Sequence, residues 1–224
     1  MLYLIKYKNL IKIKNIVYYL LLVGFVFTSN HTYPEDWDIL QNNEDWELIK
    51  NLENIDVFTK KIINSGLSVY KAELLSTLPS ELLIQVAWEV ENSVEIFPNA
   101  FIIEAGIYSY YSDSSYTGYQ VFDIPFLSKR LYQFNSIRKS NSVFWNSTHN
   151  LGNDLNPNNL MLPPINFGSW HVKKSGDKSK LIYRLCTDPG GNVPLWIVDK
   201  ATQKYIPQML KDLEKFASNR LNSK

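Results

Sequence analysis

The sequence has few of the side chains that form disulfides or hold metal ions, with one cysteine and three histidines in 224 residues. Because Cys186 has no second cysteine to pair with, an intramolecular disulfide and a cysteine-based metal site are both excluded. The histidines, His31, His149 and His171, lie far apart, and neither H-x-x-x-H nor H-E-x-x-H occurs. No metal ion and no cofactor is therefore expected.

Motifs of the common enzyme classes are also missing. The sequence contains neither the G-x-S-x-G of hydrolases nor a glycine-rich loop that holds phosphates, and residues 188–191 (Asp-Pro-Gly-Gly) are predicted to form a turn. Glu89, Glu91 and Glu95 are close in sequence, but Glu89 and Glu91 do not share a face of a helix. No catalytic residue is predicted, and the chain is expected not to be an enzyme.

The protein has little net charge of either sign. The formal charge is +1, but four lysines lie before residue 30, and the rest of the chain carries 19 basic and 22 acidic side chains. A mildly acidic domain lacks the basic surface that nucleic acids require. Nucleic acid is therefore not an expected partner.

The N-terminus is typical of a segment that directs export. Residues 1–15 mix lysines with apolar side chains, and residues 16–27 form a charge-free apolar run of twelve. As a helix this run would span ~18 Å, well short of a ~30 Å hydrocarbon core. We interpret residues 1–29 as a signal peptide of a periplasmic or secreted protein. No A-x-A cleavage site occurs, so a membrane anchor at residues 10–29 stays open as the alternative.

After a polar lead-in at residues 30–44, the pattern of apolar residues predicts strands, one helix and more strands. Strands at 55–63 and 67–75 are separated by Asn-Ser-Gly, a hairpin signal. Apolar residues then recur at helical spacing over 79–90. Further strands are predicted at 101–111, 116–124, 131–137, 142–148, 168–173 and 181–187.

A long helix is predicted at residues 194–218, with Pro207 expected to bend it. One stripe of this helix is apolar: Leu195, Val198, Tyr205, Met209, Leu213 and Phe216. An antiparallel sheet needs one face covered, and a single amphipathic helix provides the cover, which makes the fold class α+β. A curved sheet closed by one helix tends to leave a hollow that holds a small molecule.

Four segments, in order and at suitable spacing, resemble the START (steroidogenic-acute-regulatory-related lipid transfer) family, and most of all its exported bacterial branch. They are D-W-E-L at 45–48 leading into I-D-V-F-T-K at 55–60, Y-Q-V-F-D-I-P-F at 119–126 followed by Lys129-Arg130, G-S-W-H-V at 168–172, and I-Y-R-L-C-T-D-P-G-G-N-V-P-L-W-I-V at 182–198. The resemblance covers residues 37–219 and places a START-like domain at 45–219.

The resemblance implies a helix-grip fold, in which a curved antiparallel sheet wraps around the C-terminal helix and encloses a hydrophobic tunnel. It also implies binding or transfer of a lipid, such as a phospholipid or fatty acid, by a monomer that contacts membranes transiently. The mouth of the tunnel would lie at the last helix and the loop before Arg130. Thr117 lies near the position where some sterol-binding members carry an acidic residue, so a sterol is not named.

Nine residues are predicted to contact the lipid. Arg130 is expected to bind a head group at the tunnel mouth, because a guanidinium binds phosphate or carboxylate with two hydrogen bonds, although a surface position at a strand start is the plainer reading. Arg138 has no acidic partner in the family pattern. Four aromatic candidates have plain core packing as their alternative: Trp88, Phe122, Trp170 and Tyr183. Three candidates share one stripe of the last helix, Tyr205, Met209 and Leu213, and this stripe must face the sheet whether or not the hollow is filled.

Two other functions stay open on the same fold. One is an enzyme of the aromatase/cyclase kind, which would need acidic or basic residues that converge in the hollow. The other is an interaction module whose cavity is filled by its own side chains.

Overall fold

A computed structural model describes residue 38 and residues 40–42, 44–62, 66–148, 155–191 and 193–223. The chain divides into two units, residues 1–34 and 35–224. The first unit lies outside the described residues, so the signal peptide and the alternative anchor stay predictions. Within the described part of the chain, no helix is long and apolar enough to cross a membrane.

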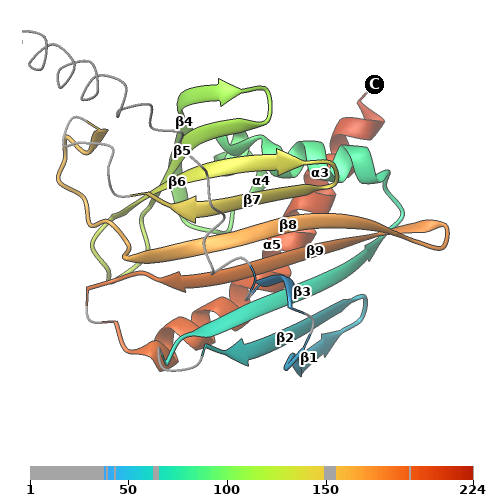
Figure 1. Ribbon diagram of the computed structural model, residues 1–224, viewed down its shortest axis with the longest axis horizontal. Helices are drawn as coiled ribbons and strands as arrows, with labels where there is room; N and C mark the ends of the chain where they lie inside the picture. Colours follow the sequence, from blue (N-terminus) through green and yellow to red (C-terminus); the bar gives the residue numbers. More distant parts are fainter. Residues whose placement is uncertain are drawn as a thin grey trace, which may run out of the picture. The chain divides into compact units, whose positions relative to one another are not determined.

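Nine antiparallel strands form one sheet in the order β1-β2-β3-β9-β8-β7-β6-β5-β4 (Figure 1). The chain builds one edge with its first three strands, crosses to the far edge at β4 and returns strand by strand until β9 pairs with β3. The strands are β1 (Glu47–Leu52), β2 (Ile55–Lys61), β3 (Ser68–Ser76), β4 (Ile102–Ser112), β5 (Ser115–Phe122), β6 (Arg130–Lys139), β7 (Ser142–Ser147), β8 (Ile165–Ser175) and β9 (Lys178–Asp188).

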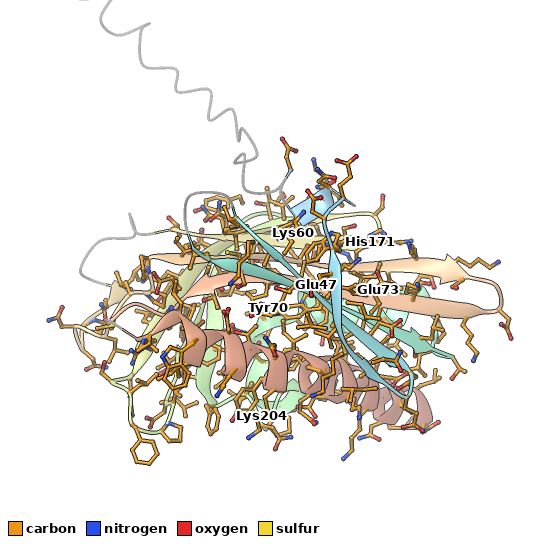
Figure 2. All side chains as sticks on the ribbon, turned by 90° about the horizontal axis from the view of Figure 1, so that it is seen from below. Glu47, Lys60, Tyr70, Glu73, His171 and Lys204 are labelled. Carbon is orange, nitrogen blue, oxygen red and sulfur yellow. The ribbon has the colours of Figure 1, made fainter. Side chains whose placement is uncertain are left out.

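The helices lie on one face of this sheet. The long helix α5 (Leu195–Asn222) runs across that face behind the strands in Figure 1, and Figure 2 shows it along the lower side of the sheet. Three short elements, α3 (Ser80–Trp88), η1 (Val90–Asn92) and α4 (Ser93–Ile96), connect β3 to β4 and pack beside it. The result is the α+β helix-grip arrangement expected from the sequence. We call the sheet face that α5 covers the inner face and the opposite one the outer face.

The main core lies between the inner face and the helices. Alternate residues of the central strands point into it, because successive side chains of a strand face opposite sides. Tyr70 of β3 also reaches α5, where its hydroxyl donates to Asp199 Oδ1 at 2.7 Å. The fully buried members of the core include Val57, Ala72, Leu74, Leu83, Leu181, Ile206, Leu210, Leu213 and Ala217.

Several element boundaries differ from the prediction. The edge strand β1 was not predicted. Strands β8 and β9 are longer than the predicted 168–173 and 181–187, because they continue as a polar hairpin that turns at Gly176 (φ +64°) and because β8 already begins at Ile165, opposite Asp188. The predicted helix at 79–90 ends at Trp88, and the chain continues through η1 and α4.

The buried stripe of α5 is also shifted from the predicted one. Leu195 is 39% exposed because it lies in the first turn of the helix. The helix is continuous through Pro207, which is buried. The residues that α5 buries are Thr202, Ile206, Pro207, Leu210, Asp212, Leu213 and Ala217.

Candidate ligand-binding cavity

A cavity of about 230 Å³ lies between the inner face of the sheet and the helices. Strands β5 to β9 form its floor, and α3, η1, α4, the segment at 97–101 and the first half of α5 form its roof. Each strand contributes every second residue, as the alternation of a sheet requires. The cavity therefore belongs to the same layer as the core and interrupts it.

Aromatic rings line most of the floor. Tyr183 is central, because its ring centre lies 4.1 Å from that of Trp170 and 5.7 Å from that of Trp145. Gly168 makes room for this arrangement: a Cβ atom there would lie 2.2 Å from the Trp145 ring and 2.4 Å from the Arg184 carbonyl oxygen. A second aromatic pair, Phe122 and Tyr132, extends the wall at 4.8 Å.

The charge within the cavity is small and is paired. Among the described lining residues, the only charged side chain is Glu89. Arg220 donates to both of its carboxylate oxygens at 2.7 Å, and Gln85 and Asn92 donate at 3.1 and 3.0 Å. Burial favours the neutral acid, but these hydrogen bonds outweigh it and lower the pKa of Glu89. Glu89 is therefore an ionised carboxylate whose hydrogen-bonding capacity is used by the protein.

The remaining polar groups of the cavity are uncharged. Gln120 Nε2 donates to Ser93 Oγ at 2.8 Å, and this hydroxyl in turn donates to the Val90 carbonyl. Burial raises the pKa of the Tyr132 and Tyr183 hydroxyls, so both stay neutral at physiological pH. The cavity thus offers hydroxyl and amide groups but no free positive or negative charge.

Five of the nine predicted lipid-contacting residues line this cavity. Phe122, Trp170 and Tyr183 reach it from the sheet, and Tyr205 and Met209 reach it from α5. The structure therefore brings together residues that are up to 87 positions apart in the chain. Whether they contact a lipid stays a prediction.

Arg130 lies outside the cavity lining and is buried, not a surface residue as its plainer reading expected. Its side chain is 2% exposed, and its guanidinium donates to the Pro189 carbonyl at 3.3 Å and to the carbonyl of Ser128. A Cβ atom at Gly191 would come within 3.1 Å of its Nη2. Arg130 therefore joins the loop before β6 to the turn that precedes α5, and its donors bind two backbone carbonyls and the Ser128 hydroxyl.

The other three predicted residues also lie outside the lining. Arg138 Nη1 donates to Gln85 Oε1 at 2.7 Å, which links β6 to α3 and gives this arginine a neutral partner. Trp88 packs against Tyr116 with ring centres 4.4 Å apart. Leu213 is fully buried in the core. For Trp88 the observed environment is the plain core packing that was the alternative, and Leu213 faces the sheet as its helix stripe predicted.

Sequence reasoning missed several lining residues. Tyr132 and Trp145 lie in strands that were predicted, and their spacing of two from other inward residues was the available signal. Ser93 and Phe97 lie beyond the predicted helix, in elements whose short lengths leave no periodicity to detect. Gln120 lies two residues before Phe122 on the same face.

Large apolar side chains are exposed on two segments that flank the cavity. One is the loop between β5 and β6, in which Ile124 lines the cavity and Phe126 is fully exposed. The other is the start of α5, where Trp196 is 61% exposed and Ala201, also exposed, lines the cavity. These segments are the ones expected at the mouth of a tunnel.

Known structures share this architecture although sequence comparison alone finds nothing. No family model matches the chain, and no curated protein matches it. Human STARD10 aligns with a TM-score of 0.69 and 16% identity over 84% of this chain and 79% of its own. A STAR-related lipid transfer protein fragment from Xanthomonas axonopodis aligns with a TM-score of 0.64 and 19% identity, over 78% and 99% of the two chains. The chain therefore has the START, or helix-grip, fold.

The same fold also occurs in enzymes. The aromatase/cyclase Zhui from a Streptomyces species aligns with a TM-score of 0.55 and 10% identity, over 69% of this chain and 96% of its own. The likeness therefore establishes the architecture, and the residues of the cavity have to decide between binding and catalysis.

Proposed function

We propose that the protein binds a lipid in the cavity under α5 without covalent chemistry, and that this lipid has one hydrocarbon chain or a compact apolar body with an uncharged polar group. The observation that carries the proposal is the aromatic-lined cavity, in which Glu89, the one charged side chain among the described lining residues, is already paired with Arg220. An apolar ligand gains from such a site because leaving water is favourable, while a charged group would be desolvated without a partner.

The size of the cavity supports a small ligand. At about 230 Å³ it lies just below the ~300–1,000 Å³ of typical small-molecule pockets. Burying one methylene group contributes ~0.8 kcal/mol, so a chain of about ten supplies roughly 8 kcal/mol before the costs of association. A two-chain phospholipid would need α5 to move away from the sheet.

The cavity favours binding over catalysis of the aromatase/cyclase kind. A general base must be free to accept a proton from the substrate. Among the described lining residues, Glu89 is the only carboxylate, and four donors from Arg220, Gln85 and Asn92 already occupy its oxygens. His171 does not reach the cavity, because it points to the outer face of the sheet, where its Nδ1 is 2.7 Å from Ser142 Oγ.

A further part of the proposal is that the protein takes up its lipid from a membrane. Phe126 and Trp196 are exposed on the two segments that flank the cavity, and Lys200 lies 5.1 Å from the Trp196 ring. Tryptophan and lysine together suit the interface between head groups and acyl chains. With residues 1–29 read as an export signal or anchor, this membrane would face the periplasm or the outside of the cell.

Native mass spectrometry of protein purified without detergent tests the proposal, together with analysis of a lipid extract. We expect one lipid per chain. Thr202→Phe fills the cavity from α5 and should reduce occupancy, while Lys211→Phe, on an exposed position of the same helix, should leave it unchanged. A protein that stays empty after incubation with phospholipids, fatty acids and sterols would contradict the carrier function.

A further inference from the structure

The outer face of the sheet carries a cluster of basic side chains that the proposed lipid site does not use. On adjacent strands, Lys71 of β3 pairs directly with Arg184 of β9, and Arg184 pairs directly with Ser169 of β8. Figure 2 shows Lys60, Glu73 and His171 on this side, away from α5 and Lys204. The basic members of the outer-face cluster are Lys60, Lys71, Lys173, Lys180 and Arg184, with His171 at its rim.

The described acidic side chains nearby, Glu73, Asp56 and Asp45, are fewer than the five basic ones, and Asp45 acts on Lys60 at the edge of the cluster. Glu73 bridges two lysines, with 3.2 Å to Lys71 Nζ and 2.9 Å to Lys180 Nζ. Asp56 accepts from Asn51 at 2.5 Å. Burial lowers the pKa of Lys71, Glu73 raises it only partly back, and the charges of Arg184 and Lys173 lower it further. Burial and the same two cations lower the pKa of His171, which shows that the cations of the cluster repel one another.

Arg184 is the least satisfied member. Its Nε is the one buried side-chain nitrogen or oxygen without a hydrogen-bond partner in the described part of the chain. Burial lowers the pKa of its guanidinium, and the charge of Glu73 raises it only partly back. Because a buried guanidinium nitrogen without a hydrogen-bond partner is costly, native structures seldom keep one unless it binds something.

Lys71 is held beside Arg184 by its surroundings. Its side chain is 10% exposed, and its Nζ lies 4.1 Å from the Phe58 ring centre and 5.0 Å from that of Trp46. Aromatic faces attract the ammonium and fix its position, so it does not swing into water. Two cations directly opposite on neighbouring strands destabilise a sheet. Lys71 and Arg184 are such a pair, and they lie on the sheet face opposite to the main core.

We propose that Arg184 and Lys71 form an oxyanion-binding site on the outer face of the sheet, with Lys60 and Lys173 adding positive charge at its edge. The ligand is a phosphate group, which accepts two parallel hydrogen bonds from a guanidinium and neutralises the excess charge. It comes either from a small soluble phosphate compound or from a phosphate-bearing lipid head group. This site is separate from the cavity, because Tyr183 and Arg184 point to opposite faces of β9.

The test measures binding of inorganic phosphate by equilibrium dialysis at constant ionic strength, and binding to phosphatidylcholine vesicles with and without phosphatidic acid by co-sedimentation. The wild-type protein should bind one of these phosphate sources. Arg184→Gln and Lys71→Met should each weaken that binding by about tenfold or more, the effect of losing a charge-assisted hydrogen bond. Lys211→Gln removes an exposed charge from α5 and should not change it.

Saturable binding of free phosphate would assign a soluble ligand, and binding only to phosphatidic acid vesicles would assign a lipid head group. Far-ultraviolet circular dichroism checks that the variants fold. If Arg184→Gln does not fold, Lys71→Met still tests the site. The proposal is overturned if the wild-type protein binds neither source, or if both variants bind like Lys211→Gln. Lipid occupancy of the cavity, read by native mass spectrometry, should be unchanged in all of them, which separates this outcome from the failure of the lipid site.

Discussion

The two faces of the same strands carry side chains of different chemistry. On β9, Tyr183 points into an aromatic cavity with no unpaired charge, and the next residue, Arg184, points to a basic cluster on the other side. On β8, Trp170 and His171 divide in the same way. Because the side-chain period of a strand is two, one sequence can encode an apolar site and a charged site that share a backbone. The sheet therefore separates an apolar cavity on its inner face from a basic cluster on its outer face.

Truncating the aromatic wall should have the largest effect on stability. Trp170 is 5% exposed and packs against Tyr183 and Phe97. Trp170→Ala should lower the free energy of unfolding by about 3–5 kcal/mol, because it removes a large buried ring and leaves a void. Urea denaturation measures this loss. A loss below about 1 kcal/mol would mean that the wall is not part of the core.

Crowding the floor should cost nearly as much. A methyl group at Gly168 meets both the Trp145 ring and the Arg184 carbonyl oxygen, and the backbone cannot give way. Gly168→Ala should destabilise by about 3 kcal/mol. Gly176→Ala is the control, because its Cβ meets nothing within 4 Å and only the positive φ of the turn costs about 1 kcal/mol. Equal losses in urea denaturation would show that Gly168 is not needed for close packing.

Neutralising Glu89 should change how stability depends on pH. Its hydrogen bonds lower the folded-state pKa below that of the unfolded chain, so their contribution is present above the unfolded pKa of ~4.3 and is lost as the pH falls through the folded pKa. Glu89→Gln should lower the free energy of unfolding by about 1–2 kcal/mol at neutral pH, and its stability should fall less steeply as the pH becomes acidic. Thermal unfolding between neutral and acidic pH tests this. An unchanged acid limb would exclude Glu89 as its source.

Removing charge from the outer face should have the smallest effect and the opposite sign. Lys71→Met keeps the buried stem, relieves the repulsion with Arg184 and leaves Glu73 paired with Lys180. The free energy of unfolding should stay the same or rise by up to about 1 kcal/mol. Urea denaturation of Lys71→Met and Trp170→Ala under the same conditions compares the two faces directly. A loss of 2 kcal/mol or so would show that Lys71 has a structural role.

Much of the fold could be predicted from residue patterns, but not where polar segments form strands. The alternation in β5, β6 and β9 and the helical spacing in α5 come from the buried face, which hydrophobicity reports. The strand β1 (Glu47–Leu52) is an edge strand with mostly exposed residues, so it lacks that signal. The ends of β8 and β9 next to their turn are rich in lysine and serine, so this part of the hairpin could not be predicted for the same reason.

The cavity was only partly predictable because its lining depends on contacts between distant segments. Aromatic residues in predicted strands, such as Trp170 and Tyr183, were found, since their type and face suffice. Arg130 was assigned to a head group because an arginine near a tunnel mouth suits one. One of its acceptors is a backbone carbonyl 59 residues further along the chain, which no local pattern reveals.

The central claim is that the space under α5 holds one small lipid with an uncharged polar group. A native mass spectrum of the protein purified without detergent, with the bound molecule identified from an extract, tests it most directly. The account predicts one single-chain or compact lipid per chain, lost in Thr202→Phe and kept in Lys211→Phe. An empty protein that takes up no lipid, or equal occupancy in both variants, would contradict it.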